Sequence, residues 1–173
     1  MRLILAAIGC FLTICVCPLA CTSGSSCGPG NHCECAGGDE CFLECDGDHC
    51  DQACHDMRRC GTVCGDGCAS TCHSIGSVCS QSCGAGCLLE CYSMPTCGVI
   101  CGPGCHFNCH DASNCSAHVG PDSEVTCSSV MSCAVQCDGK CIVHCADNGC
   151  QITCAGGQPA SECEHGRFAC GGC

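Results

Sequence analysis

The sequence has very few large aromatic residues and very few basic ones. Its 173 residues include no Trp, one Tyr and four Phe, which excludes a conventional core built around large rings. Lys and Arg together number 5, against 17 Asp and Glu, so the net charge is −12 with neutral His. Such a surface repels a phosphate backbone. We therefore expect no nucleic-acid partner, and we interpret the scattered acidic residues as a solvated surface.

Cysteine, by contrast, is present in great excess. It supplies 34 of the 173 residues, whereas proteins of a reducing cytosol keep few thiols. This density indicates either a disulfide-bonded protein of an oxidising compartment or a store of metal thiolates. A metallothionein-type store needs dense Cys-x-Cys pairs and many lysines, but the predicted mature chain has one such pair, Cys33-Glu-Cys35, and one lysine, Lys140. Disulfides are therefore favoured, and a cysteine-rich metal store is the lesser alternative.

Residues 1–20 have the form of a secretory signal peptide. Arg2 precedes the apolar run 3–16, which is too short to span a bilayer. The segment that follows, CPLAC, resembles a bacterial lipobox, so Cys21 is a candidate for lipidation after cleavage. Ordinary cleavage without lipid is the alternative, because Pro stands where the lipobox pattern wants Leu. Residues 21–40 are expected to form a tether and an N-terminal cap.

A repeat of 17 to 19 residues runs through residues 41–154. A full unit carries four cysteines, which we number first to fourth in chain order, with a Gly-containing turn between the second and the third. The first cysteines are Cys41, Cys60, Cys79, Cys97, Cys115, Cys133 and Cys150. Residues 155–173 break this spacing and are expected to form a C-terminal cap.

The Cys-x-x-x-Cys segments have the pattern of short β-strands. In a strand, the two cysteines and the residue midway between them lie on one face. The midway residue is large and apolar in seven of eleven segments, for example Leu43, Val99 and Phe107. Frequent Gly and the lack of long uninterrupted segments argue against helices. We therefore predict an all-β, disulfide-rich β-solenoid of about seven short-strand repeats, with a string of disulfide-closed β-hairpins as the alternative.

One defective repeat, residues 115–132, indicates how the cysteines pair. It has Val119 and Ser123 in place of the second and third cysteines, so both were lost together. Because loss of one alone would strand a thiol, the second and third cysteines are expected to bond to each other, which leaves the first to pair with the fourth. Bridges between adjacent repeats are the alternative. The expected inner bridges are Cys45–Cys50, Cys64–Cys68, Cys83–Cys87, Cys101–Cys105 and Cys137–Cys141. The expected outer bridges are Cys41–Cys54, Cys60–Cys72, Cys79–Cys91, Cys97–Cys109, Cys115–Cys127 and Cys133–Cys145.

Gly-x-Gly turns such as Gly65-Asp66-Gly67 and Gly84-Ala85-Gly86 separate the Cys-x-x-x-Cys units, and a signal sequence precedes them. In this arrangement the chain resembles the cysteine-rich repeat lipoproteins and secreted proteins of myxobacteria and their relatives. The resemblance covers nearly the whole mature chain. It implies a protein of the outer cell envelope or the extracellular space, and it implies no shared biochemical activity.

Histidines directly follow three of the fourth cysteines. If the repeats stack in register, His55 and His73 become neighbours on one edge with Asp56 beside them. Two imidazoles and a carboxylate are ligands that suit Zn or Cu. Polar residues on an exposed corner are the simpler interpretation. No other cofactor is expected.

No arrangement of serine, histidine and carboxylate and no phosphate-binding loop stands out in the sequence. We therefore expect a non-enzymatic, exported structural or interaction protein, held to a membrane only if lipid is attached at its N-terminus. A metal-binding module that uses the edge histidines is the competing hypothesis. Its protein or surface partner and its oligomeric state are left open.

Overall fold

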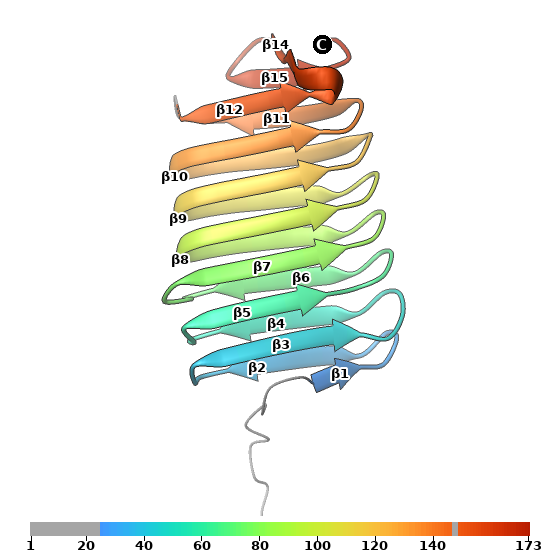
Figure 1. Cartoon of the computed structure of the whole chain (residues 1–173), viewed down its shortest axis with the longest axis vertical. Coiled ribbons are helices and arrows are strands. Elements are labelled where there is room, and N and C mark those ends of the chain that lie inside the picture. Colours follow the sequence, from blue (N-terminus) through green and yellow to red (C-terminus); the bar gives the residue numbers. More distant parts are fainter. Residues whose placement is uncertain (1–24, 147–148) are drawn as a thin grey trace, which may run out of the picture.

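The computed structural model describes residues 25–146 and 149–173, which form a β-solenoid of stacked coils (Figure 1). Each coil crosses the molecule twice, and each crossing pairs in parallel with the equivalent crossings of the coils before and after it. The all-β solenoid of about seven repeats is thereby confirmed. The alternative, a string of hairpins, is wrong, because the hydrogen-bonded neighbours belong to successive coils. The predicted signal peptide, residues 1–20, and the lipidation candidate Cys21 lie outside the described residues.

The coils form two faces. The front face, toward the viewer in Figure 1, has β1 (Ser25–Cys27), β3 (Glu40–Cys45), β5 (Arg59–Val63), β7 (Val78–Cys83), the second halves of β8 (Leu88–Cys101), β9 (His106–Val119) and β10 (Ser123–Cys137), and β12 (Cys150–Cys154). The back face has β2 (His32–Ala36), β4 (Asp51–His55), β6 (Ala69–His73), the first halves of β8, β9 and β10, and β11 (Cys141–Cys145).

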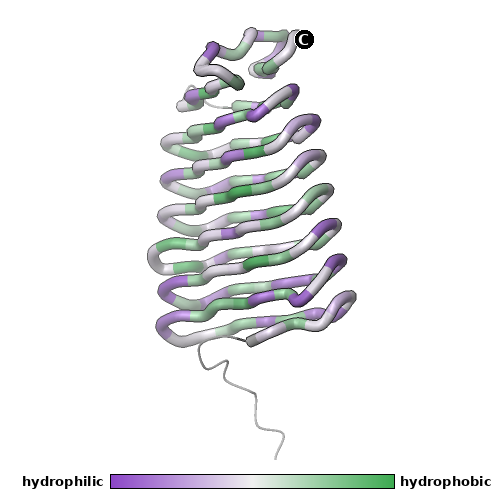
Figure 2. The backbone as a smooth tube through the Cα atoms, turned by 45° about the vertical axis from the view of Figure 1, so that its right-hand side comes forward, coloured by the Kyte–Doolittle hydropathy of each residue, from purple (hydrophilic) through white to green (hydrophobic). Residues whose placement is uncertain are grey.

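Two edges join the faces. The glycine edge holds the turns between second and third cysteines, such as 65–67 and 84–86, and lies on the right in Figure 1. The histidine edge holds the turns between each fourth cysteine and the next first cysteine, such as 55–59, and lies on the left. Hydrophilic residues are frequent in the turns along both edges (Figure 2).

The interior is one narrow layer between the two faces. Burial alternates along the strands, as in β3, where every second residue is buried. The register pairs equivalent repeat positions of successive coils. Leu89, Phe107 and Val125 therefore stack in one ladder, and each is exposed by 2% or less. Cysteines occupy the buried positions on both sides of this ladder. The core therefore consists of a thin central row of side chains flanked by rows of sulfur.

The central row of the early coils contains several polar side chains beside Leu43. Gln52, Thr62, Ser70 and Gln81 are all buried. Their polar atoms contact one another or the backbone, except Gln52 Oε1, which is buried without a hydrogen-bond partner. The Thr62 and Ser70 hydroxyls lie 2.8 Å apart, and the Gln81 side-chain amide donates to the Ser70 carbonyl at 3.0 Å. The Gln52 amide likewise donates to the Val63 carbonyl at 3.1 Å. Because a buried polar group is costly only without partners, Thr62, Ser70 and Gln81 fit an interior that has few apolar side chains, whereas Gln52 leaves one oxygen unpaired.

The disulfides at the histidine edge correct the predicted pairing. Each fourth cysteine is bonded to the first cysteine that follows it, across one turn, with Cα atoms 6.3 to 6.5 Å apart. These bridges are Cys35–Cys41, Cys54–Cys60, Cys72–Cys79, Cys91–Cys97, Cys109–Cys115, Cys127–Cys133 and Cys145–Cys150. All six predicted outer bridges are wrong: Cys41–Cys54, Cys60–Cys72, Cys79–Cys91, Cys97–Cys109, Cys115–Cys127 and Cys133–Cys145. The physical reason is that a turn of only four to six residues joins each fourth cysteine to the next first cysteine, so the first cysteine of a unit is already bonded to the fourth cysteine before it.

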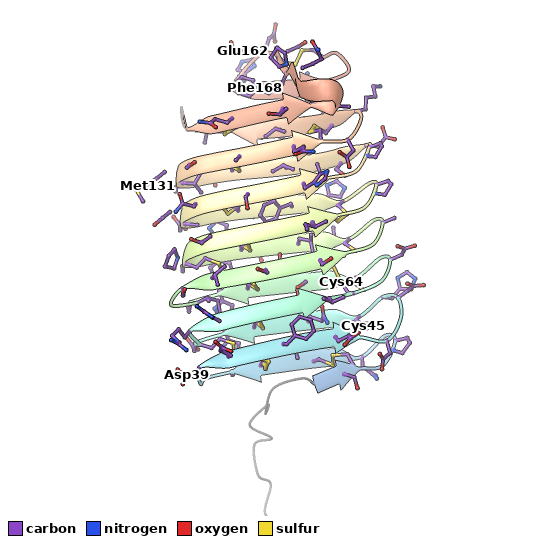
Figure 3. All side chains as sticks on the ribbon, in the orientation of Figure 1. Asp39, Cys45, Cys64, Met131, Glu162 and Phe168 are labelled. Carbon is purple, nitrogen blue, oxygen red and sulfur yellow. A yellow bond between two sulfur atoms is a disulfide. The ribbon has the colours of Figure 1, made fainter. Side chains whose placement is uncertain are left out.

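At the glycine edge the outcome is mixed. The structure contains three of the predicted inner bridges, Cys45–Cys50, Cys101–Cys105 and Cys137–Cys141. The predicted bridges Cys64–Cys68 and Cys83–Cys87 are wrong. Instead Cys64 is bonded to Cys83 of the next coil, where stacking brings the Cα atoms to 4.8 Å, and Cys68 and Cys87 are free. Figure 3 labels Cys45 and Cys64 on this edge, and it labels Asp39 and Met131 on the histidine edge.

The two ends of the solenoid differ. Within residues 21–40, predicted as tether and cap, β1 and β2 pair with β3 and β4, so the first described residues are already part of the solenoid. The C-terminal segment folds back as β13 (Gln158–Pro159), β14 (Ser161–Glu162) and β15 (Arg167–Cys170), after a single 3-10 turn at Ala155–Gly157. Antiparallel pairing of β15 with β11 and the bridges Cys154–Cys170 and Cys163–Cys173 close this end. Among the described residues, no helix is long and apolar enough to cross a membrane.

Candidate functional site on the histidine edge

Four rings form a continuous stack at the histidine edge. His55, His73, Tyr92 and His110 each follow a fourth cysteine and lie in register on successive coils. Their ring centroids are 4.9, 4.9 and 5.1 Å apart, and neighbouring planes differ by 8° or less. The spacing matches the distance between neighbouring strands, so the parallel ladder itself sets the stack. The predicted neighbours His55 and His73 are therefore placed side by side.

The residue after each ring turns the chain sharply. Asp56, Ser74, Ser93 and Asp111 all have positive φ, between 51° and 55°. Short polar residues tolerate this left-handed region better than other non-glycine residues. The bend turns the polar side chain back toward the ring before it, so that Asp56 Oδ2 lies 2.9 Å from His55 Nδ1 and Asp111 Oδ2 lies 2.9 Å from His110 Nδ1. One local turn thus places both a ring and its partner.

Carboxylates hold His55 from both sides. Its Nε2 lies 2.6 Å from Glu34 Oε1, and its Nδ1 contacts Asp56. Only the doubly protonated ring can donate to both carboxylates, so these hydrogen bonds raise the pKa of His55 above its usual value of 6.5, against the opposing effect of burial. The hydrogen bond from His55 likewise lowers the pKa of Glu34. The N-terminal end of the stack is therefore a charge-paired cluster.

The predicted metal ligands meet in a geometry that suits stacking better than coordination. A Zn–N bond is about 2.0 to 2.1 Å long, so two nitrogens on one ion lie at most about 4.2 Å apart. The rings of His55 and His73 are parallel with centroids 4.9 Å apart, and both ring nitrogens of His55 contact carboxylates. Within the described residues, the groups of three ligand atoms that converge within 4.8 Å consist of cysteine alone. A metal at His55, His73 and Asp56 would require the rings to turn.

Sequence reasoning missed three members of this edge. Tyr92 completes the stack between His73 and His110, and Glu34 and Glu90 supply carboxylates from the back strands, with Glu90 Oε1 3.8 Å from His110 Nε2. The signal for Tyr92 was present, because it occupies the same repeat position as the three histidines. The carboxylates could be found only once the register of the back face was known.

The front face presents a second feature, a shallow groove of about 590 Å³. Its floor is one small residue per coil, and successive members pair in register: Gly61, Ser80, Gly98, Ser116 and Ala134. Phe42 lies in the same row on the coil before them. No Asp, Glu, Lys or Arg lines the groove, although the chain carries a net charge of −12. The front groove is therefore a strip without Asp, Glu, Lys or Arg on an acidic protein, and His118, which also lines it, lies 2.8 Å from Asp138.

Comparison with known proteins gives no relative for this chain. No protein-family model, no curated protein and no solved structure matches it. The fold and the bridges by themselves define its class, a β-solenoid stapled by disulfides at its two edges.

Proposed function

We propose that the protein is a non-enzymatic, exported structural or interaction protein of the cell envelope or extracellular space. The observation that carries the proposal is its bridging, with fourteen disulfides among the described residues. Disulfides of this density persist in oxidising compartments. A rigid scaffold held in this way suits the display of fixed surfaces.

The uncharged front groove supports the interaction role. An acidic surface repels acidic partners at long range, and cell surfaces are commonly acidic. A strip without charges lets a partner approach without desolvating ions, which is the costly part of burying a surface. The back face is less suited, because Glu34, Glu90 and Glu124 are spread along it, whereas the carboxylates of the front strands, Glu40 and Glu44, are confined to β3. A partner is therefore expected on the front face.

Export is tested by fractionating the cells that make the protein and alkylating each fraction before and after reduction. The expected result is an exported protein whose described cysteines are nearly all protected until reductant is added. Intact mass of the same material reports whether Cys21 carries lipid. A folded protein found in the cytosol with mostly free thiols would overturn the proposal and revive the metal store, which needs thiolates.

The interaction role is tested by charging the front groove in a Cys21→Ala background, where no lipid can retain the protein. Ser80→Asp with Ser116→Asp should release the protein from the envelope fraction. The matched control, Thr71→Asp with Thr126→Asp, adds the same charge to the back face and should leave retention unchanged. Equal retention of both variants would remove the front groove from the proposal.

A metal-binding module on the histidine edge is the second candidate. The observation in its favour is the row of His55, His73 and His110 with carboxylates alongside. Titration calorimetry with Zn and with Cu(II) tests it against the variant His55→Gln with His73→Gln. Binding that the variant loses supports a metal site. Indifference of the parent protein to both metals removes this candidate.

A further inference from the structure

Two buried thiols interrupt an otherwise bridged interior. Cys68 and Cys87 are the two free cysteines among the described residues, and their side chains are exposed by 1% and 0%. Both are third cysteines, and they occupy equivalent places on adjacent coils, because the residues that follow them pair in register. Their coils also contain Cys64 and Cys83, which bond to each other across the coils with Cα atoms 4.8 Å apart. These four cysteines of the glycine edge therefore contain one disulfide and two thiols.

The backbone at this place permits a second pairing. Neighbouring coils close the same corner within one coil, through Cys45–Cys50 and Cys101–Cys105, with Cα atoms 6.3 and 6.4 Å apart. The turns 65–67 and 84–86 have the same form as the bridged turn 102–104, with φ of 64°, 65° and 69° at their last glycines. Corner spacings and the inter-coil spacing of 4.8 Å both lie within the usual disulfide range of about 4.4 to 6.8 Å. The backbone therefore allows either a single bridge between the two coils or one bridge within each coil.

The Cys87 sulfur is close enough to the Cys64–Cys83 bridge to exchange with it, whereas the Cys68 sulfur lies within 4.8 Å of both sulfurs of the Cys45–Cys50 bridge. The Cys87 sulfur and both sulfurs of the Cys64–Cys83 bridge lie within 4.8 Å of one another. Exchange requires a thiolate to attack a disulfide sulfur. Burial raises the pKa of the Cys87 thiol, and its side chain is closed to solvent, so the thiol persists and exchange with its bridged neighbours is slow.

We propose that Cys64, Cys68, Cys83 and Cys87 form a four-sulfur redox centre, which holds one mobile disulfide and takes up a second one from a low-molecular-weight disulfide. In the first step the Cys87 thiolate attacks the Cys83 sulfur. The Cys83–Cys87 bond forms, the Cys64–Cys83 bond breaks, and Cys64 leaves with the electron pair and takes up the proton that Cys87 released. The centre still holds one disulfide, and Cys64 and Cys68 are now the two thiols at one corner.

The second step is a two-electron oxidation. The thiols of Cys64 and Cys68 form a disulfide with each other, and the external disulfide is reduced to two small thiols that receive the two protons. The centre then has one bridge in each coil, the pattern of its neighbours Cys45–Cys50 and Cys101–Cys105. Reduction by small thiols reverses the step, so the centre stores one pair of electrons while the remaining bridges stay intact.

The experiment follows these four cysteines in the full chain. The protein is equilibrated in mixtures of reduced and oxidised dithiothreitol, quenched with acid, denatured, alkylated and mapped by mass spectrometry. Cleavage before Asp66 separates Cys64 from Cys68, and cleavage after Ala85 separates Cys83 from Cys87. The expected result is one step in which two alkyl groups are gained, before any other bridge opens, with label recovered at all four positions. Label confined to Cys68 and Cys87 at every ratio, a different bridge opening first, or no step before global unfolding would overturn the proposal.

Two variants copy a corner that the protein already tolerates. Ser123 stands at the third-cysteine position of its coil and accepts the Cys105 N–H at 3.1 Å, as the Cys68 sulfur accepts the Cys50 N–H at 3.3 Å. Cys68→Ser with Cys87→Ser should therefore fold, keep the Cys64–Cys83 bridge and lose the two-thiol step.

The second variant, Cys64→Val with Cys68→Ser, reproduces the pair Val119 and Ser123. It leaves Cys83 and Cys87 as the two thiols of this corner, beside the intact Cys101–Cys105 bridge, and should bond them to each other in oxidised dithiothreitol. Far-UV circular dichroism checks the fold of both variants. Folded protein in which Cys83 and Cys87 stay thiols under these conditions would refute the exchange.

Discussion

The cost of removing one glycine-edge bridge can be worked out from the structure, because the chain contains a natural example of its absence. The double change Cys137→Val with Cys141→Ser copies the pair Val119 and Ser123 of the preceding coil. Those residues are buried and stack in register against Cys137 and Cys141. The double variant would therefore present the same side chains, at the same corner, one coil further along.

The expected loss comes almost entirely from the unfolded chain. The bridge closes residues four apart in sequence, and the loop-entropy relation gives about 2 kcal/mol for a five-residue loop at 25 °C. The valine fills the place of one sulfur, so no large cavity is left. The serine hydroxyl can accept the Ser123 N–H in the way that Ser123 accepts the Cys105 N–H. We therefore expect the free energy of unfolding to fall by about 2 kcal/mol, with the native fold retained.

The assay is equilibrium unfolding in guanidinium chloride without reductant, followed by far-UV circular dichroism. The matched control is Cys137→Ser with Cys141→Val, which places the two side chains the wrong way round and should lose more. A loss above about 4 kcal/mol in the first variant would mean that the sulfurs stabilise the native state itself, and the loop argument would be wrong. No measurable loss would be equally damaging, because the unfolded chain would then not be constrained by the bridge.

Three further outcomes are expected. Phe107→Ala should lower the free energy of unfolding by about 3 to 5 kcal/mol, whereas Phe107→Leu should cost less than about 1.5 kcal/mol, because Phe107 is the aromatic ring of the central row and is 2% exposed. Gly120→Ala should destabilise the solenoid, since a Cβ there would lie 2.6 Å from the backbone of the coil before it, and Gly98→Ala should not, since its nearest new contact is 3.5 Å away. NMR titration should find the pKa of His55 above 6.5, and Glu34→Gln should lower it. Because the folded pKa is raised, the stability that protonation of His55 contributes is fully present below pH 6.5 and is lost as pH rises through the folded value.

Each of these has an outcome that contradicts it. Equal stability of the two Phe107 variants would show that the central row contributes little to packing. Equal melting temperatures for Gly120→Ala and Gly98→Ala would show that the coils can separate locally at no cost. A pKa of His55 at or below its usual value, unchanged by Glu34→Gln, would mean that the carboxylate contact does not form in solution.

The coil and its inward cysteines could be predicted from the sequence, because two local signals agree. The Cys-x-x-x-Cys spacing places both cysteines on one side of a strand, and the period near 18 residues brings Cys97 above Cys79 and below Cys115. The glycine turns mark where each coil reverses. These are short-range constraints, and each follows from the sequence within one or two repeats.

The bridges could be predicted only in part, because pairing depends on how the coil is cut into units. Counting from a first cysteine made Cys97 and Cys109 partners in one unit, yet Cys97 is bonded back to Cys91 and Cys109 forward to Cys115. The five residues between Cys91 and Cys97 form a turn as tight as the glycine turns but without Gly, since Ser93 accepts positive φ. That turn could not be recognised from composition. The ring stack could not be predicted for the same reason, because it depends on the turn that follows each fourth cysteine.

Because the bridges at the edges hold the coils together, the outward side chains of both faces contribute little to the stability of the fold. Ordinary solenoids must conserve bulky inward residues, but here even Gln52 and Gln81 are accepted in the central row. The outward rows are freer still, and they differ in kind: the front has a row of small uncharged residues, and the back has carboxylates beside histidines. Such a difference between two faces of one regular ladder is not required by the fold, since Ser or Glu would fit either side. It is therefore the property that the proposed interaction role explains and that the fold alone does not.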